Sequence, residues 1–66
     1  MKAKKGLLFE ARRKKGMTQT EIAERAGISQ AAYCNIEGGK RNPSVGTARR
    51  IGKVLGIEWF LIFEKE

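Results

Sequence analysis

The sequence predicts an all-α fold, a compact five-helix bundle that forms a single domain over residues 1–66. Three observations lead to this prediction. The length suits one domain, near the lower limit for a core that folds without disulfides or metals. Glycines and the single proline divide the chain into five segments of helical length. Within four of these segments, apolar residues recur every three or four positions, which is the period of an amphipathic helix.

The first segment, about residues 6–15, has three apolar side chains that share one face: Leu7, Leu8 and Ala11. Its last turn carries four cations, residues 12–15, which suit the negative end of the helix dipole. Gly16 then ends the helix.

The second and third segments carry helix-capping signals. Thr18, with Glu21 three residues later, has the pattern of a capping box, and Gly27 ends that helix. Ser29 is the expected N-cap of the next helix, which Gly38 and Gly39 stop. Two capped helices around a tight turn predict a helix-turn-helix over about residues 18–37. Their inner faces are small or apolar: Ile22, Ala23, Ala26, Tyr33 and Ile36.

The fourth segment begins at Ser44 as N-cap and ends at Gly56. Its inner face reads Val45, Ala48, Ile51, Gly52 and Leu55. The fifth segment, about residues 58–63, is short and almost wholly apolar. We predict a helix there, with an edge strand as the alternative, because Trp, Phe and Ile also favour strands.

The composition argues against several classes of function. The chain has no histidine, no aspartate and one cysteine, Cys34. A disulfide, a zinc site and a histidine-based catalytic pair are therefore not expected. We predict a protein that is not an enzyme and holds no cofactor and no metal. The longest apolar run, residues 59–63, is too short to span a bilayer, and the basic start lacks a secretory apolar region, so we predict a cytoplasmic protein without a membrane partner.

The charge is uneven along the chain. The net charge is +7, and residues 1–50 hold 12 cations and 4 anions, whereas residues 51–66 hold 2 cations and 3 anions. A basic body predicts a polyanionic partner, nucleic acid above all, with solubility as the plain alternative.

The third segment has a surface typical neither of a core helix nor of a solvated one. Opposite Tyr33 and Ile36 it presents small or uncharged side chains: Gln30, Ala31, Cys34 and Asn35. The second helix of a helix-turn-helix enters the major groove, where Gln and Asn can pair with adenine and an alanine methyl can contact thymine. We therefore predict that these four residues contact bases of double-stranded DNA. Cys34 serves as a small side chain in this interpretation, and a redox switch is the alternative.

Three motifs, 12-RRKKGMTQTEIAERAGIS-29, 36-IEGGKRNPS-44 and 54-VLGI-57, resemble the Cro/C1-type helix-turn-helix regulators, or XRE family, typified by lambdoid phage repressors. The resemblance spans about residues 7–63 and implies a lambda repressor-like DNA-binding domain. It also implies that Arg12 and Glu37 form a structural ion pair between the first and third helices. The chain departs from the family at Ala31 and Ala32, where longer polar side chains are common.

The resemblance further implies contacts to DNA phosphates, since a helix N-terminus suits an anion. The expected contacts are Thr18, Gln19, Ser29, Tyr33, Lys40, Arg41, Asn42 and Ser44. Capping alone is the alternative for Thr18, a solvated loop for Lys40 and Arg41, and a place in the core for Tyr33. The basic start, Lys2, Lys4 and Lys5, is either a disordered arm on DNA or only a charged terminus.

Phe60 and Leu61 have no evident place in the core, and they stand where the family commonly has polar residues, so they predict a partner surface. We predict a homodimer through the fourth and fifth helices, with recognition helices about one DNA turn apart on a palindromic operator. The predicted function is a nucleoid-associated, sequence-specific transcriptional regulator, by default a repressor, without a small-molecule effector. One alternative is an antitoxin or other protein-binding module that masks its partner through residues 59–63 and binds DNA for autoregulation. The other is non-specific nucleoid binding by charge alone.

Overall fold

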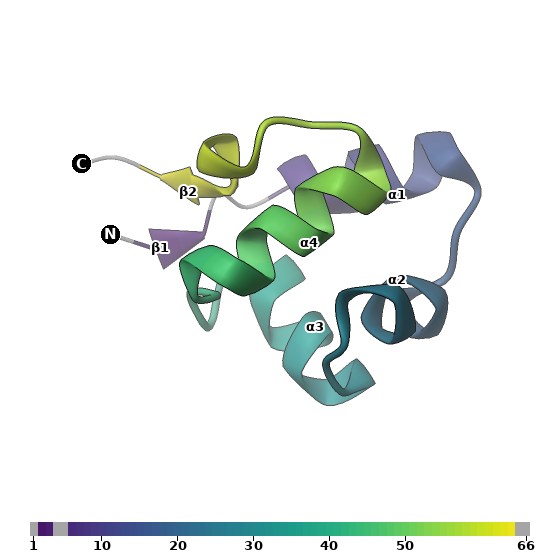
Figure 1. Cartoon of the computed structure of the whole chain (residues 1–66), viewed down its shortest axis with the longest axis horizontal. Coiled ribbons are helices and arrows are strands. Elements are labelled where there is room, and N and C mark those ends of the chain that lie inside the picture. The colour runs from purple at the N-terminus through teal and green to yellow at the C-terminus, as the bar shows by residue number, and fades with distance from the viewer. Residues whose placement is uncertain (1, 4–5, 65–66) are drawn as a thin grey trace.

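Four α-helices account for most of the chain in a computed structural model that describes residues 2–3 and 6–64 (Figure 1). In chain order the elements are β1 (Lys2–Ala3), α1 (Leu7–Lys15), α2 (Gln19–Ala26), α3 (Gln30–Glu37), α4 (Val45–Leu55), the 3-10 helix η1 (Trp59–Ile62) and β2 (Phe63–Glu64). The helical class predicted from the sequence is confirmed. None of the helices in the described part of the chain is long and apolar enough to cross a membrane.

Local side-chain chemistry sets the starts of three of the helices. Thr18 and Glu21 form the full capping box of α2, with Thr18 N–H donating to Glu21 Oε1 at 2.8 Å and Glu21 N–H donating to Thr18 Oγ1 at 3.1 Å. Ser29 and Ser44 cap α3 and α4 with a single bond each, their hydroxyl oxygens accepting from the backbone N–H groups of Ala32 and Thr47. Gly27 ends α2 at φ 73°, a left-handed conformation that glycine adopts without strain, and so makes the tight turn into α3.

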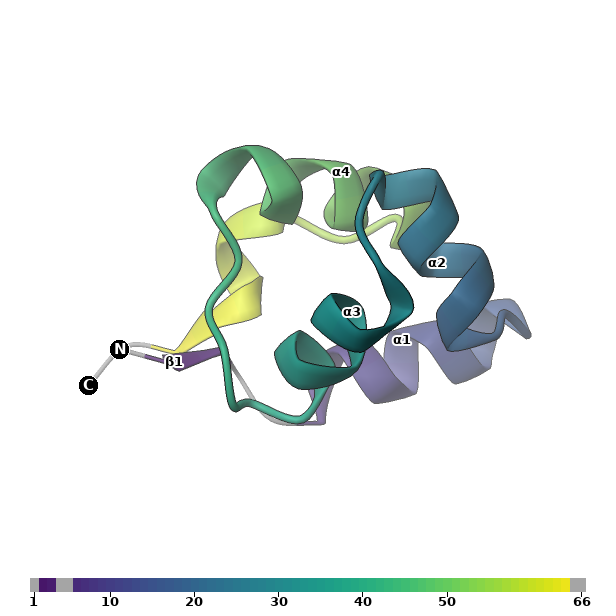
Figure 2. The same ribbon diagram turned by 90° about the horizontal axis from the view of Figure 1, so that it is seen from below.

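The core lies where α2, α3 and α4 meet, with α1 and η1 closing it. Its largest fully buried side chains come from five different elements: Leu8, Ile22, Tyr33, Ile51 and Ile62. Between them lie Ala23, Ala26 and Ala48, whose small size lets the helices approach closely. Figure 2 shows the result from below: α3 faces the viewer, framed by α1, α2 and α4. The core thus holds α3 from behind and leaves its other side open.

The predicted count of five helices is not confirmed. The fifth segment forms only four residues of 3-10 helix, Trp59–Ile62, and then continues as β2. This strand pairs antiparallel with β1, so that Lys2 stands opposite Glu64 and Ala3 opposite Phe63. The sequence allowed either a helix or a strand in this segment, because its aromatic and β-branched residues also favour strands. The structure contains both: a 3-10 helix followed by a short strand.

The disordered-arm interpretation of the basic start does not fit Lys2. The backbone of Lys2 lies in β1, hydrogen-bonded into the two-stranded sheet. Lys4 and Lys5 lie outside the described residues.

Candidate nucleic-acid interface

The exposed side of α3 is the first part of the candidate site. The four residues that the sequence assigns to base contacts, Gln30, Ala31, Cys34 and Asn35, are all exposed. The opposite side of the same helix is buried, with Tyr33 fully enclosed and Ile36 almost so. The structure therefore brings the four candidates together on one surface of a helix whose reverse side is fixed in the core.

A cluster of hydrogen bonds around Glu37 fixes the end of α3 to α1 and α2. Arg12 Nε donates to Glu37 Oε2 at 2.7 Å and Arg12 Nη2 donates to Glu37 Oε1 at 3.3 Å, so the pair implied by the family resemblance is bidentate. Tyr33 OH donates to Oε2 at 3.3 Å, and Gln19 Nε2 donates to Oε1. Arg12 Nη1 donates to the carbonyl of Met17 at 3.0 Å, which ties in the loop before α2.

This cluster controls the ionisation of Glu37, which is only 7% exposed. Burial is the largest single influence and raises the pKa of its carboxyl, but the hydrogen bonds from Arg12 and Gln19, with the charge of Arg12, outweigh it. The pKa of Glu37 therefore lies below its ordinary value. Burial, first of all, and then the Glu37 charge raise the pKa of the Tyr33 hydroxyl, so Tyr33 stays a neutral donor.

Acid should destabilise the fold through Glu37. A carboxyl whose pKa is lower in the folded state contributes stability above its unfolded pKa, near 4.5, and loses that stability as the pH falls through the folded value. We expect the free energy of unfolding, measured with urea, to fall between about pH 6 and about pH 3, and Glu37→Gln to flatten that decline. Glu24→Gln removes an exposed carboxylate and is the control. An equal decline in wild type and Glu37→Gln contradicts the assignment.

The predicted phosphate contacts divide into exposed and enclosed residues. Thr18, Ser29 and Ser44 are exposed at the N-termini of α2, α3 and α4, and Lys40, Arg41 and Asn42 are exposed in the loop between α3 and α4. Neither Lys40 nor Arg41 forms an ion pair with another described residue. The ion pair within the described part of the chain joins Arg12 and Glu37.

Tyr33 and Gln19 each donate a hydrogen bond to Glu37 that the prediction did not include. Tyr33 is fully buried with its hydroxyl on Glu37, so its place is in the core, and the predicted phosphate contact does not fit this structure. Gln19 is partly buried and commits its amide to Glu37, which leaves the second N–H of that amide for a phosphate. Sequence reasoning missed the Gln19–Glu37 bond because no local spacing relates two residues 18 positions apart.

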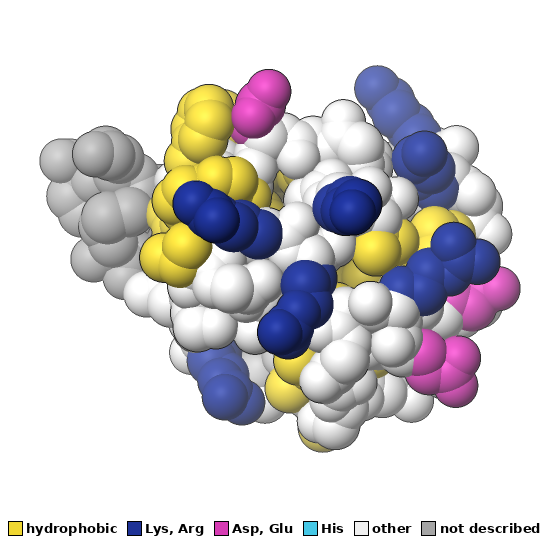
Figure 3. Space-filling view, viewed as in Figure 1, with side chains coloured by type: hydrophobic (Ala, Val, Ile, Leu, Met, Phe, Trp, Pro, Cys, Tyr) yellow, Lys and Arg dark blue, Asp and Glu magenta, His cyan; other side chains and the backbone are white. Residues whose placement is uncertain are grey.

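Basic side chains cover much of one face of the molecule, on which α4 is foremost and α3 lies at the lower edge (Figure 1, Figure 3). Figure 3 shows Lys and Arg side chains spread over the face of the first view, whereas acidic side chains gather at the right, over α2, and at the top. A field dominated by cations attracts a polyanion at long range and is weakened by salt.

The exposed apolar side chains of η1 form a separate feature. Phe60 is 54% exposed and Leu61 42% exposed, and Figure 3 shows a hydrophobic area at the left, over η1. Trp59 is partly buried and forms a T-shaped pair with Phe60, with ring centroids 5.9 Å apart. The guanidinium of Arg49 lies 5.4 Å from the centroid of the Trp59 ring. The sequence had singled out Phe60 and Leu61. The exposure of Phe9 was not predicted, and the prediction that Val45 lies on the inner face of its helix was wrong, since Val45 is 50% exposed at the start of α4.

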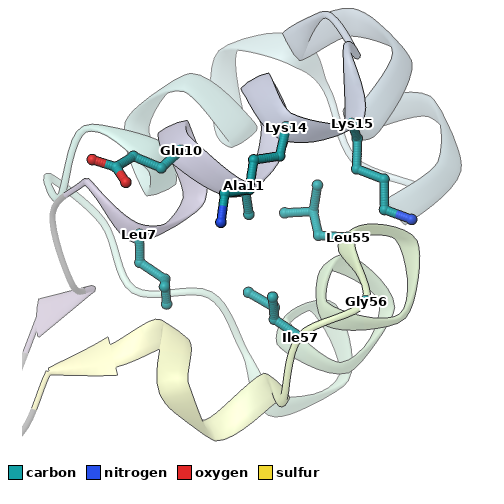
Figure 4. A pocket seen from close by; sticks show the side chains of 8 residues that line it. All are labelled: Leu7, Glu10, Ala11, Lys14, Lys15, Leu55, Gly56 and Ile57. Carbon is teal, nitrogen blue, oxygen red and sulfur yellow. The ribbon is translucent and has the colours of Figure 1, made fainter.

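A cavity of about 410 Å³ between α1 and the end of α4 contains none of the candidate residues (Figure 4). Leu7, Leu55 and Ile57 contribute apolar walls, and the side chain of Lys14 extends over Ala11 at its edge. This side of α1 faces α4 and the loop after it, and not α3.

Comparison with known proteins agrees with this geometry. A family model described as Helix-turn-helix matches residues 8–62. The HTH-type transcriptional regulator YqaF of Bacillus subtilis (strain 168), itself described as uncharacterized, is 47% identical over 57 residues, which are 86% of this chain and 75% of YqaF. The immunity repressor protein of Bacillus phage phi105 is 33% identical over 83% of this chain and 38% of its own length.

A solved structure extends the likeness to three dimensions. The restriction-modification controller protein C.AhdI from Aeromonas hydrophila superposes with a TM-score of 0.75 at 30% identity, over 85% of each chain. The family model covers α1 to η1, and so includes the capped helix pair, the exposed side of α3 and the Glu37 cluster. The chain belongs to the XRE-type helix-turn-helix family of DNA-binding transcriptional regulators.

Proposed function

We propose that this domain recognises a specific sequence in double-stranded DNA and represses transcription by occupying an operator as a homodimer. The observation that carries the proposal is the surface of α3. Gln30, Ala31, Cys34 and Asn35 are exposed on a helix whose other side is fixed by Tyr33 and the Glu37 cluster. Small side chains let a helix lie deep in the major groove, and the amides of Gln30 and Asn35 are suited to adenine.

Phosphate contacts would hold this helix in register. In our proposal Thr18, Gln19, Ser29 and Ser44 bind the backbone at helix N-termini, and Lys40, Arg41 and Asn42 bind it from the loop before α4. The hydroxyl oxygens of Thr18, Ser29 and Ser44 already accept the capping N–H bonds. The hydroxyl hydrogens of Thr18 and Ser29 and the neighbouring backbone amides are therefore the groups to meet a phosphate. The Ser44 hydroxyl donates to Thr47 Oγ1 at 3.1 Å, so at α4 the contact falls to the backbone amides.

The dimer is proposed from the η1 patch, which we define as Phe60 and Leu61. Two large apolar side chains, exposed side by side on a small domain, favour self-association about a two-fold axis. Repression follows from occupancy, since a dimer on a palindrome covers the DNA between its half-sites, and the phage phi105 relative is named a repressor. Such a regulator would act at the nucleoid.

A selection from a random double-stranded DNA library, at near-physiological salt, tests the proposal. We expect a palindrome with half-sites about one turn apart. Asn35→Ala should then cost about 1–3 kcal/mol and relax preference at one position of each half-site. Lys40→Ala is the matched control, because loss of a phosphate contact should weaken binding to all sequences alike. Binding that vanishes with salt and enriches no sequence would refute specific recognition and leave an electrostatic anchor.

The same experiment separates the second candidate function. A protein-binding module would leave the η1 patch free in a monomer and would select either a single half-site or no sequence. The observation that supports a protein-binding module is the exposure of Phe60 and Leu61. A palindromic selection by a dimeric protein decides for the regulator.

A further inference from the structure

An aromatic side chain on α1 is exposed without any role in the core or in the candidate site as described so far. Phe9 is 43% exposed and stands outside the buried cluster. Two guanidinium groups lie against its ring: the Cζ atoms of Arg12 and of Arg13 are each 5.5 Å from the ring centroid. This distance is within the range of cation–π attraction, so Phe9 holds two neighbouring cations in place.

Phe9 borders the surface assigned to DNA. A cavity of about 320 Å³ is lined by Phe9 of α1, Gln19 of α2, and Cys34 and Glu37 of α3, together with Gly6 and Gly38 just outside the helices. Cys34 is a candidate base contact and Gln19 a candidate phosphate contact. The face of α1 that carries Phe9 therefore continues the exposed surface of α2 and α3.

Arg12 and Arg13 use their guanidinium groups differently. Arg12 spends three donors on Glu37 and the carbonyl of Met17. Arg13 is exposed, and within the described part of the chain no carboxylate pairs with it. Because both guanidinium groups rest on one ring, Arg13 lies close to the Arg12–Glu37–Gln19 cluster while its own five donors stay available to an anion.

We propose that Arg13 is a further phosphate-binding residue, positioned by Phe9, which extends the DNA contact from α2 onto α1. This inference rests on the proposed function, since it adds a contact to the same interface. A guanidinium that is already oriented by an aromatic ring loses less side-chain freedom when it binds a phosphate, and its planar fork matches the phosphate oxygens. Phe9 acts only through Arg13.

The test measures how binding depends on salt, on the selected operator and on an unrelated duplex. Each phosphate contact contributes about 0.9 to the slope of log K against log salt concentration. We expect Arg13→Ala to reduce that slope by about 0.9 on both duplexes. Lys14→Ala is the matched control: it removes the same charge from the next residue, whose side chain extends over the cavity between α1 and α4. It should leave the slope unchanged.

Phe9→Leu tests the positioning role, because leucine keeps an apolar side chain and removes the ring. It should weaken binding in the wild-type background and have no further effect once Arg13 is alanine. Equal slopes for Arg13→Ala and Lys14→Ala, or a further loss from Phe9→Leu in the Arg13→Ala background, would overturn the inference. Failure of the proposed function is a separate outcome, seen as no operator preference in the wild-type protein, and the slopes on the unrelated duplex still decide the role of Arg13.

Discussion

Charging the η1 patch, by Phe60→Glu together with Leu61→Glu, should convert a dimer into a monomer and lower operator affinity on the order of 10²–10⁴-fold. Two linked recognition helices bind a palindrome with the second half-site already at high effective concentration, and a monomer loses that advantage. A pair of carboxylates on an apolar contact would be desolvated without partners and would repel their symmetry mates. Analytical ultracentrifugation and operator titration measure the two effects.

The control for this experiment is a second double variant that introduces charges of the opposite sign at the same two positions. Two glutamates also reduce the attraction of a basic domain for DNA, so part of the loss could come from electrostatics alone. Phe60→Lys with Leu61→Lys disrupts the same patch while adding positive charge. Both double variants should sediment as monomers, and both should lose the cooperative part of operator binding. A glutamate variant that remains dimeric, or a wild-type protein that is monomeric on and off the operator, contradicts the proposed dimer.

The parts of the fold that sequence predicted correctly depend on neighbours in the chain. The capping box of Thr18 and Glu21 joins residues three positions apart, and the buried and exposed sides of α3 follow from the period of one helix. Such features are fixed by local geometry, so they can be read without a structure. The exposure of the four residues proposed to contact bases could be predicted for the same reason.

The parts that sequence missed depend on distant segments. The fifth segment ends in a strand because β1, from the other end of the chain, pairs with it. Gly52 is buried on the inner face of α4, as predicted, but the sequence did not show that the segment packed against it is the loop after α4 and the first residue of η1. A Cβ atom at Gly52 would lie 2.7 Å from the carbonyl oxygen of Ile57 and 3.2 Å from Cα of Trp59. The cavity beside Phe9 likewise joins three helices. The periodic spacing of apolar residues within one helix does not predict contacts between segments that are distant in the sequence.

Breaking the Glu37 cluster should have the largest effect on stability. Arg12→Met is expected to lower the free energy of unfolding by about 3–5 kcal/mol, a large fraction of the total for a small domain. Methionine keeps an apolar stem in place of the arginine, but Glu37 remains 7% exposed with its charge unpaired. Urea unfolding followed by the fluorescence of Trp59, the single tryptophan, measures the change. Arg13→Met removes an exposed cation from the next position and should cost no more than about 0.5 kcal/mol.

A double variant shows whether the unpaired charge is the cause. Arg12→Met with Glu37→Gln removes both charges. Gln19 and Tyr33 donate to different oxygens of Glu37, so the amide oxygen of Gln can replace the acceptor for Gln19 while its NH2 group donates to the Tyr33 hydroxyl oxygen. If burial of a lone carboxylate dominates, the double variant is more stable than Arg12→Met alone. A double variant that is no more stable than the single one would instead assign the loss to the geometry of the guanidinium and its bond to the Met17 carbonyl. The cluster lies on the buried side of α3, away from the surface proposed to contact bases. Arg12→Met should therefore keep the wild-type base preference at temperatures where it is folded. This result distinguishes a residue that holds the recognition helix in place from one that contacts bases.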